Sequence, residues 1–171
     1  MVIEGESKRV MTEALLTDAQ ELVSLKQAVF EDIQQRFGAG HWPPVSNLSD
    51  VERSIAHSRI LVCKEGHTIV GMLRLSIEKP WAIDLAYFKP VSKAIYITDM
   101  AVLPARQHSG IGSQLIEYAS QTAIENDVLA LRLDTYDSEN GAGAFYLKCG
   151  FAERGRASFR GTSLRYFEKM L

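Results

Sequence analysis

The sequence predicts an α/β fold: a mixed, mostly antiparallel sheet of about six to seven strands with helices on both faces. Two observations predict it. Several short segments alternate apolar and polar residues at strand spacing, whereas others repeat apolar residues at helical spacing, and the two kinds interleave along the chain. The length of 171 residues, 46% of them hydrophobic, suits one compact domain over residues 1–171, in which 1–8 form a loose tail.

The first half of the chain predicts a strand, two helices and a hairpin. We expect a strand at 10–14, a helix that starts near Thr17–Asp18 and ends before Gly38, a short helix through Ala56 that Ser49 or Asp50 caps, and strands at 59–64 and 68–77. The first helix has capping oxygens at its start, and its apolar residues recur every three or four positions. The turn between the last two strands contains Gly66, which is typical of a hairpin.

The second half alternates strands with helices. A strand at 94–103 ends at Pro104, which cannot continue it, and a helix follows from Gly110 to about 126. The remaining elements are a strand at 129–134, a short helix at 142–148 closed by Gly150, and two strands near 153–159 and 163–169. Residues 80–93 are irregular and rich in aromatic side chains.

Composition limits the partners and the location of the protein. The formal net charge is −2, so the chain as a whole does not attract nucleic acid or an anionic membrane, and it lacks the run of about 18 apolar residues that spans a bilayer. The start of the chain lacks a signal-peptide pattern, and Cys63 and Cys149 alone do not form a disulfide framework. The histidines show no metal-site spacing. We therefore expect a cytoplasmic protein without nucleic-acid, membrane or metal partners.

The most informative segment is a loop between a strand and a helix. It consists of six residues, Gln107, His108, Ser109, Gly110, Ile111 and Gly112. Backbone N–H groups at a helix start have no partners within the helix, and the peptide dipoles add partial positive charge there, so the loop predicts an anion site that suits a pyrophosphate. The two glycines remove side chains that would keep phosphate oxygens away from the backbone.

Three other interpretations compete for this loop. A nucleoside-triphosphate loop requires a lysine after the last glycine, but Ser113 stands there. A dinucleotide-binding loop requires a third glycine where this chain has Leu115, although Asp134 lies about where that motif places its ribose-binding acid. The third alternative is an ordinary strand-to-helix turn whose glycines only permit tight packing.

The loop resembles the coenzyme A signature of the GNAT family of N-acetyltransferases, a glutamine or arginine, two variable residues, a glycine, one variable residue and a glycine or alanine. A second block of the family, a small residue followed by a tyrosine and then Gly-Phe, matches Ala142, Tyr146 and Gly150–Phe151. The resemblance covers residues 94–171 well, whereas the first 90 residues share only the order of elements. It implies a GNAT-like fold and an acyltransferase activity.

The resemblance also implies which residues bind acetyl-coenzyme A as a co-substrate. The strand before the loop would pair with the pantetheine amides through Met100, Ala101 and Val102, as an exposed sheet edge pairs with a peptide. The loop from Gln107 to Gly112, together with Ser113, would bind the pyrophosphate. Asn140, one residue closer to the tyrosine than is usual in the family, is expected to contact the pantetheine or the diphosphate.

The catalytic residues implied by the resemblance are an acid and a base. Tyr146 stands where the family places the acid that protonates the leaving thiolate, and its alternative role is a helix aromatic packed on the sheet. Asp99, on the strand before the loop, is the expected base, and its alternative role is a structural ion pair. Asp84 and then Glu78 follow it as candidates.

The acceptor is expected to be a primary amine of a small molecule, because the family transfers acetyl groups to amines by direct attack on the thioester. Trp81, Asp84, Tyr87 and Phe88 are the candidate residues of its site, although the aromatic side chains suit a core equally well. A non-catalytic acyl-coenzyme A sensor, a protein or peptide acetyltransferase and a nicotinamide-dependent oxidoreductase are the alternatives. Exposed sheet edges would also permit a homodimer.

Overall fold

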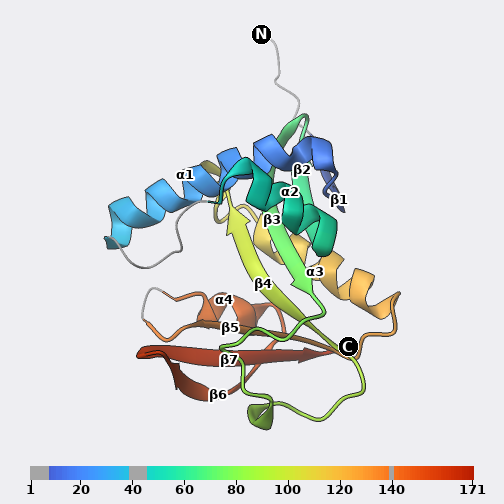
Figure 1. Ribbon diagram of the computed structural model, residues 1–171, viewed down its shortest axis with the longest axis vertical. Helices are drawn as coiled ribbons and strands as arrows, with labels where there is room; N and C mark the ends of the chain where they lie inside the picture. The colour runs from blue at the N-terminus through green and yellow to red at the C-terminus, as the bar shows by residue number, and fades with distance from the viewer. Residues whose placement is uncertain (1–7, 39–45, 139–140) are drawn as a thin grey trace. The chain divides into compact units, whose positions relative to one another are not determined.

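The computed structural model describes residues 8–38, 46–138 and 141–171 (Figure 1). The chain forms two compact units. Unit 1 comprises Met1–Arg74 and Asp99–Leu115, and unit 2 comprises Leu75–Thr98 and Ile116–Leu171. The expectation of a single domain over residues 1–171 stays a prediction.

The strands form a seven-stranded sheet in the order β1-β2-β3-β4-β5-β7-β6. Their bounds are β1 Arg9–Glu13, β2 Arg59–Glu65, β3 Thr68–Ser76, β4 Ala94–Val102, β5 Ala130–Tyr136, β6 Ala152–Phe159 and β7 Thr162–Met170. Neighbours β1 and β2, β5 and β7, and β6 and β7 run antiparallel, whereas β4 and β5 run parallel. The predicted mixed α/β sheet is therefore confirmed, and each predicted strand lies within a few residues of an observed one.

The helices also follow the predicted order: α1 Ala19–Phe37, α2 Leu48–His57, α3 Ile111–Ile124 and α4 Gly143–Lys148. The predicted cap of the second helix is wrong, whereas the first helix begins next to its predicted start, with Asp18 at the N-cap position. The cap of α2 is Asn47, whose side chain accepts a hydrogen bond from the Asp50 N–H, rather than Ser49 or Asp50. Residues 16–18 form a single 3₁₀ turn before α1, and the Asp18 carboxylate accepts from Leu15 N–H instead of capping α1.

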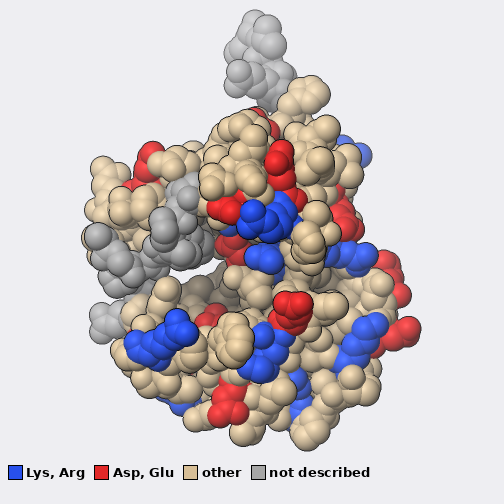
Figure 2. Space-filling model, in the orientation of Figure 1, with Lys and Arg blue, Asp and Glu red and all other residues tan. Residues whose placement is uncertain are grey.

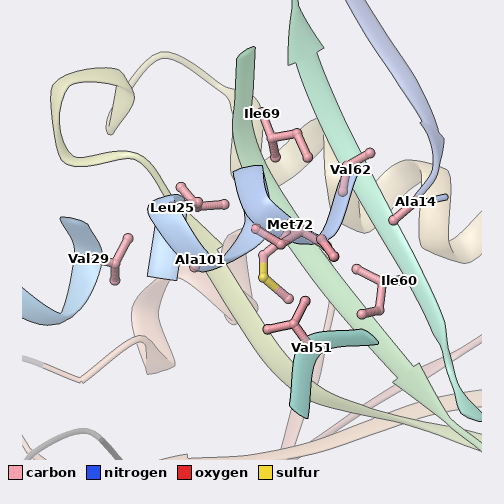
Figure 3. Close-up of a cluster of buried hydrophobic side chains, with 11 residues drawn as sticks. Ala14, Leu25, Val29, Val51, Ile60, Val62, Ile69, Met72 and Ala101 are labelled. Atoms are coloured by element: carbon pink, nitrogen blue, oxygen red, sulfur yellow. The ribbon is translucent and has the colours of Figure 1, made fainter. Parts of the chain in front are cut away.

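The core of unit 1 lies between its helices and its strands. Side chains from α1, α2, β2, β3 and β4 point toward one another in this cluster (Figure 3). The buried members are Ala14, Ala19, Leu22, Leu25, Val29, Val51, Ile60, Val62, Ile69, Met72 and Ala101. Gly71 precedes Met72 on β3, so a side chain at position 71 would point to the opposite face of the strand. The first turn of α3 packs on that face. In unit 1, helices thus cover both faces of the sheet.

Unit 2 combines an aromatic core with a buried ion-pair cluster. Ile83 and Phe88, from the irregular segment after β3, pack against Tyr96, Leu164 and Tyr166 of the sheet. The Glu168 side chain is wholly buried next to this core. Its carboxylate accepts hydrogen bonds from Arg132 Nε at 3.0 Å and from Arg154 Nε at 2.7 Å. Because both of its oxygens have cationic partners, the buried charge is compensated.

The surface carries charges of both signs. On the face drawn in Figure 2, acidic and basic side chains of the described residues are interspersed among uncharged ones instead of forming one large area of a single sign. Among the helices that the structure describes, none is long and apolar enough to span a bilayer.

Removing the Glu168 carboxylate should destabilise the protein strongly, because it leaves the buried Arg132 guanidinium without its counter-charge. We expect Glu168→Ala to lower the free energy of unfolding by about 3–5 kcal/mol in chemical denaturation. Glu13→Ala is the matched control, because it breaks the exposed Arg59–Glu13 pair and should cost less than about 1 kcal/mol. Equal losses in the two variants would contradict this assignment.

Candidate active site

The predicted phosphate loop occupies the turn between β4 and α3 in unit 1. After Pro104–Arg106, a single 3₁₀ turn, the chain turns through residues 107–110 and enters α3 at Ile111. The Ile111 side chain is buried against β3, where a Cβ on Gly71 would lie 2.7 Å from Ile111 Cγ2. Ile111 therefore anchors the helix start, and only its backbone N–H is available to an anion.

The backbone of the loop adopts conformations that favour close approach of a ligand. His108 has a φ of +60° and Gly110 a φ of +85°. A Cβ at Gly110 would meet no heavy atom of the described residues within 4 Å, so the space beside this backbone is open. Gly110 thus supplies both the left-handed turn and an unobstructed peptide next to the first N–H groups of α3.

Side chains from other elements hold the loop in place. Arg9 Nη1 of β1 donates to the Ser109 carbonyl at 2.8 Å, and Arg9 Nε donates to Glu65 Oε1 at 3.0 Å. Arg106 Nε donates to the other oxygen of Glu65 at 2.8 Å. Arg36 of α1 and the Val102 carbonyl both bond the Gln107 side-chain amide, at 3.4 Å each. Gln107 therefore has protein partners on both of its amide atoms.

The strand that leads into the loop contains the three residues expected along the pantetheine. Ala101 is buried, so only its backbone can contact a ligand, whereas Met100 and Val102 are half-buried. The Leu103 N–H that follows donates to the Val70 carbonyl at 2.9 Å. The pairing of β4 with β5 covers Ala94–Tyr96, so Met100, Ala101 and Val102 lie beyond it.

Asp99 lies in unit 1 and has a close cationic partner. Lys26 Nζ of α1 is 2.7 Å from Asp99 Oδ2, and both side chains are largely buried. A small pocket beside this pair is lined by Leu22, Lys26, Val51, Ser54, Ile60, Met72, Arg74 and Asp99. A proton transferred to Asp99 would have to compete with Lys26 for the carboxylate.

Tyr146 lies in unit 2, on the short helix α4. It is 7% exposed and its ring contacts those of Phe145, Phe151 and Phe167, with centroids 5.2, 5.6 and 5.9 Å away. At the start of α4, a Cβ on Gly143 would lie 2.2 Å from an Arg165 guanidinium nitrogen, so glycine permits the close packing of this helix on β7. Asn140, the other residue expected here, lies outside the described residues.

The aromatic segment places its predicted acceptor residues in different environments. Trp81 is 90% exposed, and Asp84 is exposed while its carboxylate accepts from the Ala86 N–H at 3.0 Å. Tyr87 packs edge-on against Tyr166 and lies so close to Gly155 of β6 that a Cβ there would be 2.4 Å from the Tyr87 ring. Phe88 is buried in the core of unit 2, which is the alternative role left open for it.

Asp134 has a chemical character that the sequence interpretation did not assign. It lies on β5 opposite Tyr166 of β7, two residues beyond Arg132, where the pairing with β4 ends. Burial raises the pKa of the Asp134 carboxyl above its usual range, although a hydrogen bond from its own backbone N–H opposes the shift. Burial is also the main cause that raises the pKa of Tyr166, and the carboxyls of Asp134 and Asp84 add to it. The sequence signal was an acidic residue within an apolar strand, but its neighbour Tyr166 comes from β7, a pairing that the sequence does not reveal.

The raised pKa of Asp134 predicts a stability effect with a definite sign. Below the unfolded-state pKa, about 3.9, the carboxyl is protonated in both states and costs nothing. As the pH rises through the folded-state pKa, the buried charge destabilises the fold. Asp134→Asn should therefore raise the thermal midpoint at pH 7 and leave it unchanged at pH 3. Asp137→Asn, which breaks an ion pair with Arg156, should give no gain at pH 7. A lower midpoint for Asp134→Asn at pH 7 would refute this interpretation.

Comparisons with known proteins agree with these features. The model of the acetyltransferase (GNAT) family matches residues 26–151, whereas a search of curated protein sequences found no match.

Among solved structures, a GNAT-family acetyltransferase from Listeria monocytogenes superposes with a TM-score of 0.74 at 20% identity, covering 99% of each chain. A ribosomal-protein-alanine N-acetyltransferase from Brucella melitensis gives 0.71 at 17% identity, covering 95% of this chain and 99% of that one. A Salmonella typhimurium protein of this fold, solved with its cofactor acetyl-CoA, gives 0.68 at 14% identity, with 96% and 95% covered. These identities show the shared fold, and the family match, which spans most of the sequence, shows that the chain belongs to the GNAT acetyltransferase family.

Proposed function

We propose that the protein is an N-acetyltransferase that moves an acetyl group from acetyl-CoA to the primary amine of a small molecule by direct attack. The observation that carries this proposal is the loop from Gln107 to Gly112. It combines the family signature with a helix start and an open backbone at Gly110. Helix N-termini of this kind bind phosphate groups through unpaired N–H groups and the helix dipole.

The donor would bind along β4 and the loop. The pyrophosphate would accept hydrogen bonds from the N–H groups that begin α3, and the pantetheine amides would pair with the backbone of Met100, Ala101 and Val102. Support comes from the position of these three residues beyond the stretch of β4 that pairs with β5. The buried side chains of Ala101 and Ile111 leave the backbone as their only donor-facing group.

In the proposed reaction the neutral amine nitrogen attacks the thioester carbonyl carbon, and the carbon–sulfur bond then breaks. Tyr146 would give its phenolic proton to the departing thiolate, and a base would take the proton that the amine nitrogen loses. A phenol, with a pKa of about 10, is protonated at neutral pH and can act as this acid. Packing against three aromatic rings fixes the direction of the Tyr146 side chain, which favours a positioned donor.

Two carboxylates are candidates for the base. Asp99 was expected from the sequence, but its ion pair with Lys26 means that the amine proton would compete with an ammonium group 2.7 Å away. Asp134 has a pKa raised by burial, which moves a carboxyl toward the value that a base needs near neutral pH. We therefore propose Asp134 ahead of Asp99, with the proton passing directly or through one water.

Two other functions keep specific support. The near-complete burial of Tyr146 among aromatic rings also suits a structural role, and a chain without an acid would serve as a non-catalytic acyl-CoA sensor. The similar fold of a ribosomal-protein-alanine N-acetyltransferase keeps a peptide or protein amine as an alternative acceptor. Trp81, Asp84 and Tyr87 would contact the acceptor, because their segment is the exposed aromatic part of unit 2.

Titration with acetyl-CoA and an acetyl-transfer screen test the proposal together. The screen would follow thiol release over small amines, amino acids, polyamines and peptides with free N-termini. We expect binding of acetyl-CoA, no binding of NAD, and thiol release with at least one small amine. Binding without release in any class would indicate the sensor, and release with peptides alone would indicate the alternative acceptor. Binding of NAD without acetyl-CoA would overturn the proposal.

Replacement of Tyr146 tests the acid. We expect Tyr146→Phe to lower kcat about 10²-fold or more, the usual contribution of a positioned proton donor, and to leave the Kd for acetyl-CoA within twofold or so. Tyr136→Phe, on an exposed tyrosine of the same unit, is the control and should retain full activity. A normal kcat in Tyr146→Phe would assign this tyrosine to packing alone.

The two proposed bases are separated by the pH dependence of kcat/KM. Asp134→Asn should remove the acidic limb of the profile and lower the rate about 10²-fold or more at neutral pH. Asp99→Asn should retain the acidic limb, because Asp99 is paired with Lys26 and is not the proposed base. The reverse result would restore Asp99 as the base.

A further inference from the structure

The phosphate loop contains a peptide whose orientation its own residues do not fix. Glycine lacks a Cβ and adopts positive and negative φ with similar ease, so the peptide between Ser109 and Gly110 can turn over at little cost. In a planar trans peptide, the carbonyl of one residue and the N–H of the next point in opposite directions. The orientation of the Ser109 carbonyl therefore decides whether the Gly110 N–H or a carbonyl oxygen faces an anion.

Arg9 binds the deciding atom. Its Nη1 donates to the Ser109 carbonyl oxygen at 2.8 Å, across 100 residues of sequence. This hydrogen bond directs the carbonyl toward β1, and the Gly110 N–H consequently points the other way. A Cβ at Gly110 would meet nothing within 4 Å among the described residues, so an anion can approach this peptide.

Glu65 holds Arg9 in that position. Its two carboxylate oxygens accept from Arg106 Nε and Arg9 Nε at 2.8 and 3.0 Å, and its side chain is 13% exposed. The hydrogen bonds from Arg106 and Arg9 lower the pKa of the Glu65 carboxyl, so it stays ionised across the neutral range. Because Ser109 Oγ also donates to the Arg106 carbonyl at 2.6 Å, both ends of the turn from 106 to 109 are tied to Glu65.

We propose that Arg9, held by Glu65, is a positioning residue of the donor site that keeps the peptide between Ser109 and Gly110 turned with its N–H toward the pyrophosphate. The assignment of the ligand rests on the proposed function, whereas the restraint on the loop does not. Loss of Arg9 lets the peptide turn over, and a carbonyl oxygen then faces the phosphate oxygens and repels them.

The test compares Arg9→Met with Arg9→Lys and with a matched control. Arg59→Met serves as the control, because Arg59 of β2 pairs with Glu13 of β1 at 3.2 Å on the same two strands, without contact to the loop. Binding of coenzyme A and of inorganic pyrophosphate would be measured by calorimetry. Amide hydrogen exchange of residues 107–113 would be measured without ligand. The kcat and the KM values for acetyl-CoA and for the amine would be measured with an amine identified in the acetyl-transfer screen.

For Arg9→Met we expect the Kd of coenzyme A and pyrophosphate to rise about tenfold, the effect of one charged hydrogen bond. Exchange of the loop amides should become faster, while kcat and the KM for the amine stay unchanged. Arg9→Lys should restore binding only in part, because one ammonium replaces the fork that bonds Ser109 and Glu65 together. Arg59→Met should match the wild type in every measurement.

The outcomes separate this inference from the proposed function. Unchanged affinity and unchanged loop exchange in Arg9→Met would overturn the role of Arg9 and leave the proposed function standing. A wild-type protein that binds neither coenzyme A nor pyrophosphate would remove the donor site and the positioning role together. In that case faster exchange in Arg9→Met would still identify the restraint on the loop.

Discussion

The start of helix α3 depends on the missing side chain at Gly71. Ile111 and Leu115 approach the β3 backbone so closely that a Cβ at position 71 would lie 2.7 and 3.1 Å from them. This contact fixes the height at which α3 begins above the strand, and therefore the position of the N–H groups in its first turn. A side chain there would push the helix outward by a few tenths of an ångström or more, and the loop would follow it. The geometry of the proposed anion site therefore depends on packing beneath it as much as on its own glycines.

Unit 2 places two carboxyl groups in different electrostatic environments. In unit 2, Glu168 is buried but compensated on both oxygens, so its charge contributes to a defined core. Asp134 lies on the same sheet, opposite Tyr166, and burial is the main cause that raises its pKa. A sheet that keeps one carboxyl fully paired on β7 and another desolvated on β5 gives up stability at the second, as catalytic sites commonly do.

Much of the fold was predictable because local signals and tertiary structure agree. The glycines at 110 and 150 and the proline at 104 mark boundaries that the structure reproduces, and periodicity located each strand and helix. The loop was predictable from its residue types for the same reason.

The partners of the loop were not predictable from the sequence, because Arg9 and Glu65 come close to Ser109 only through the pairing of β1 with β2 and the hairpin that follows. Likewise, Lys26 meets Asp99 across 73 residues, and no spacing in the sequence signals that contact. Phe88 and Trp81 look alike in sequence, yet only the first finds a place in the core.

The contact between Tyr87 and Gly155 makes the conformation of the aromatic segment sensitive to the residue at position 155. Position 155 lies on β6, where the register with β7 shifts, and the Tyr87 ring occupies the volume that any side chain there would need. Even an alanine would displace Tyr87 and reshape the segment from 80 to 93, while the contacts that hold the phosphate loop involve none of these residues. Substitution at a single strand position thus offers evolution, or a protein engineer, a route to a changed segment at the proposed acceptor site that leaves the proposed donor site intact.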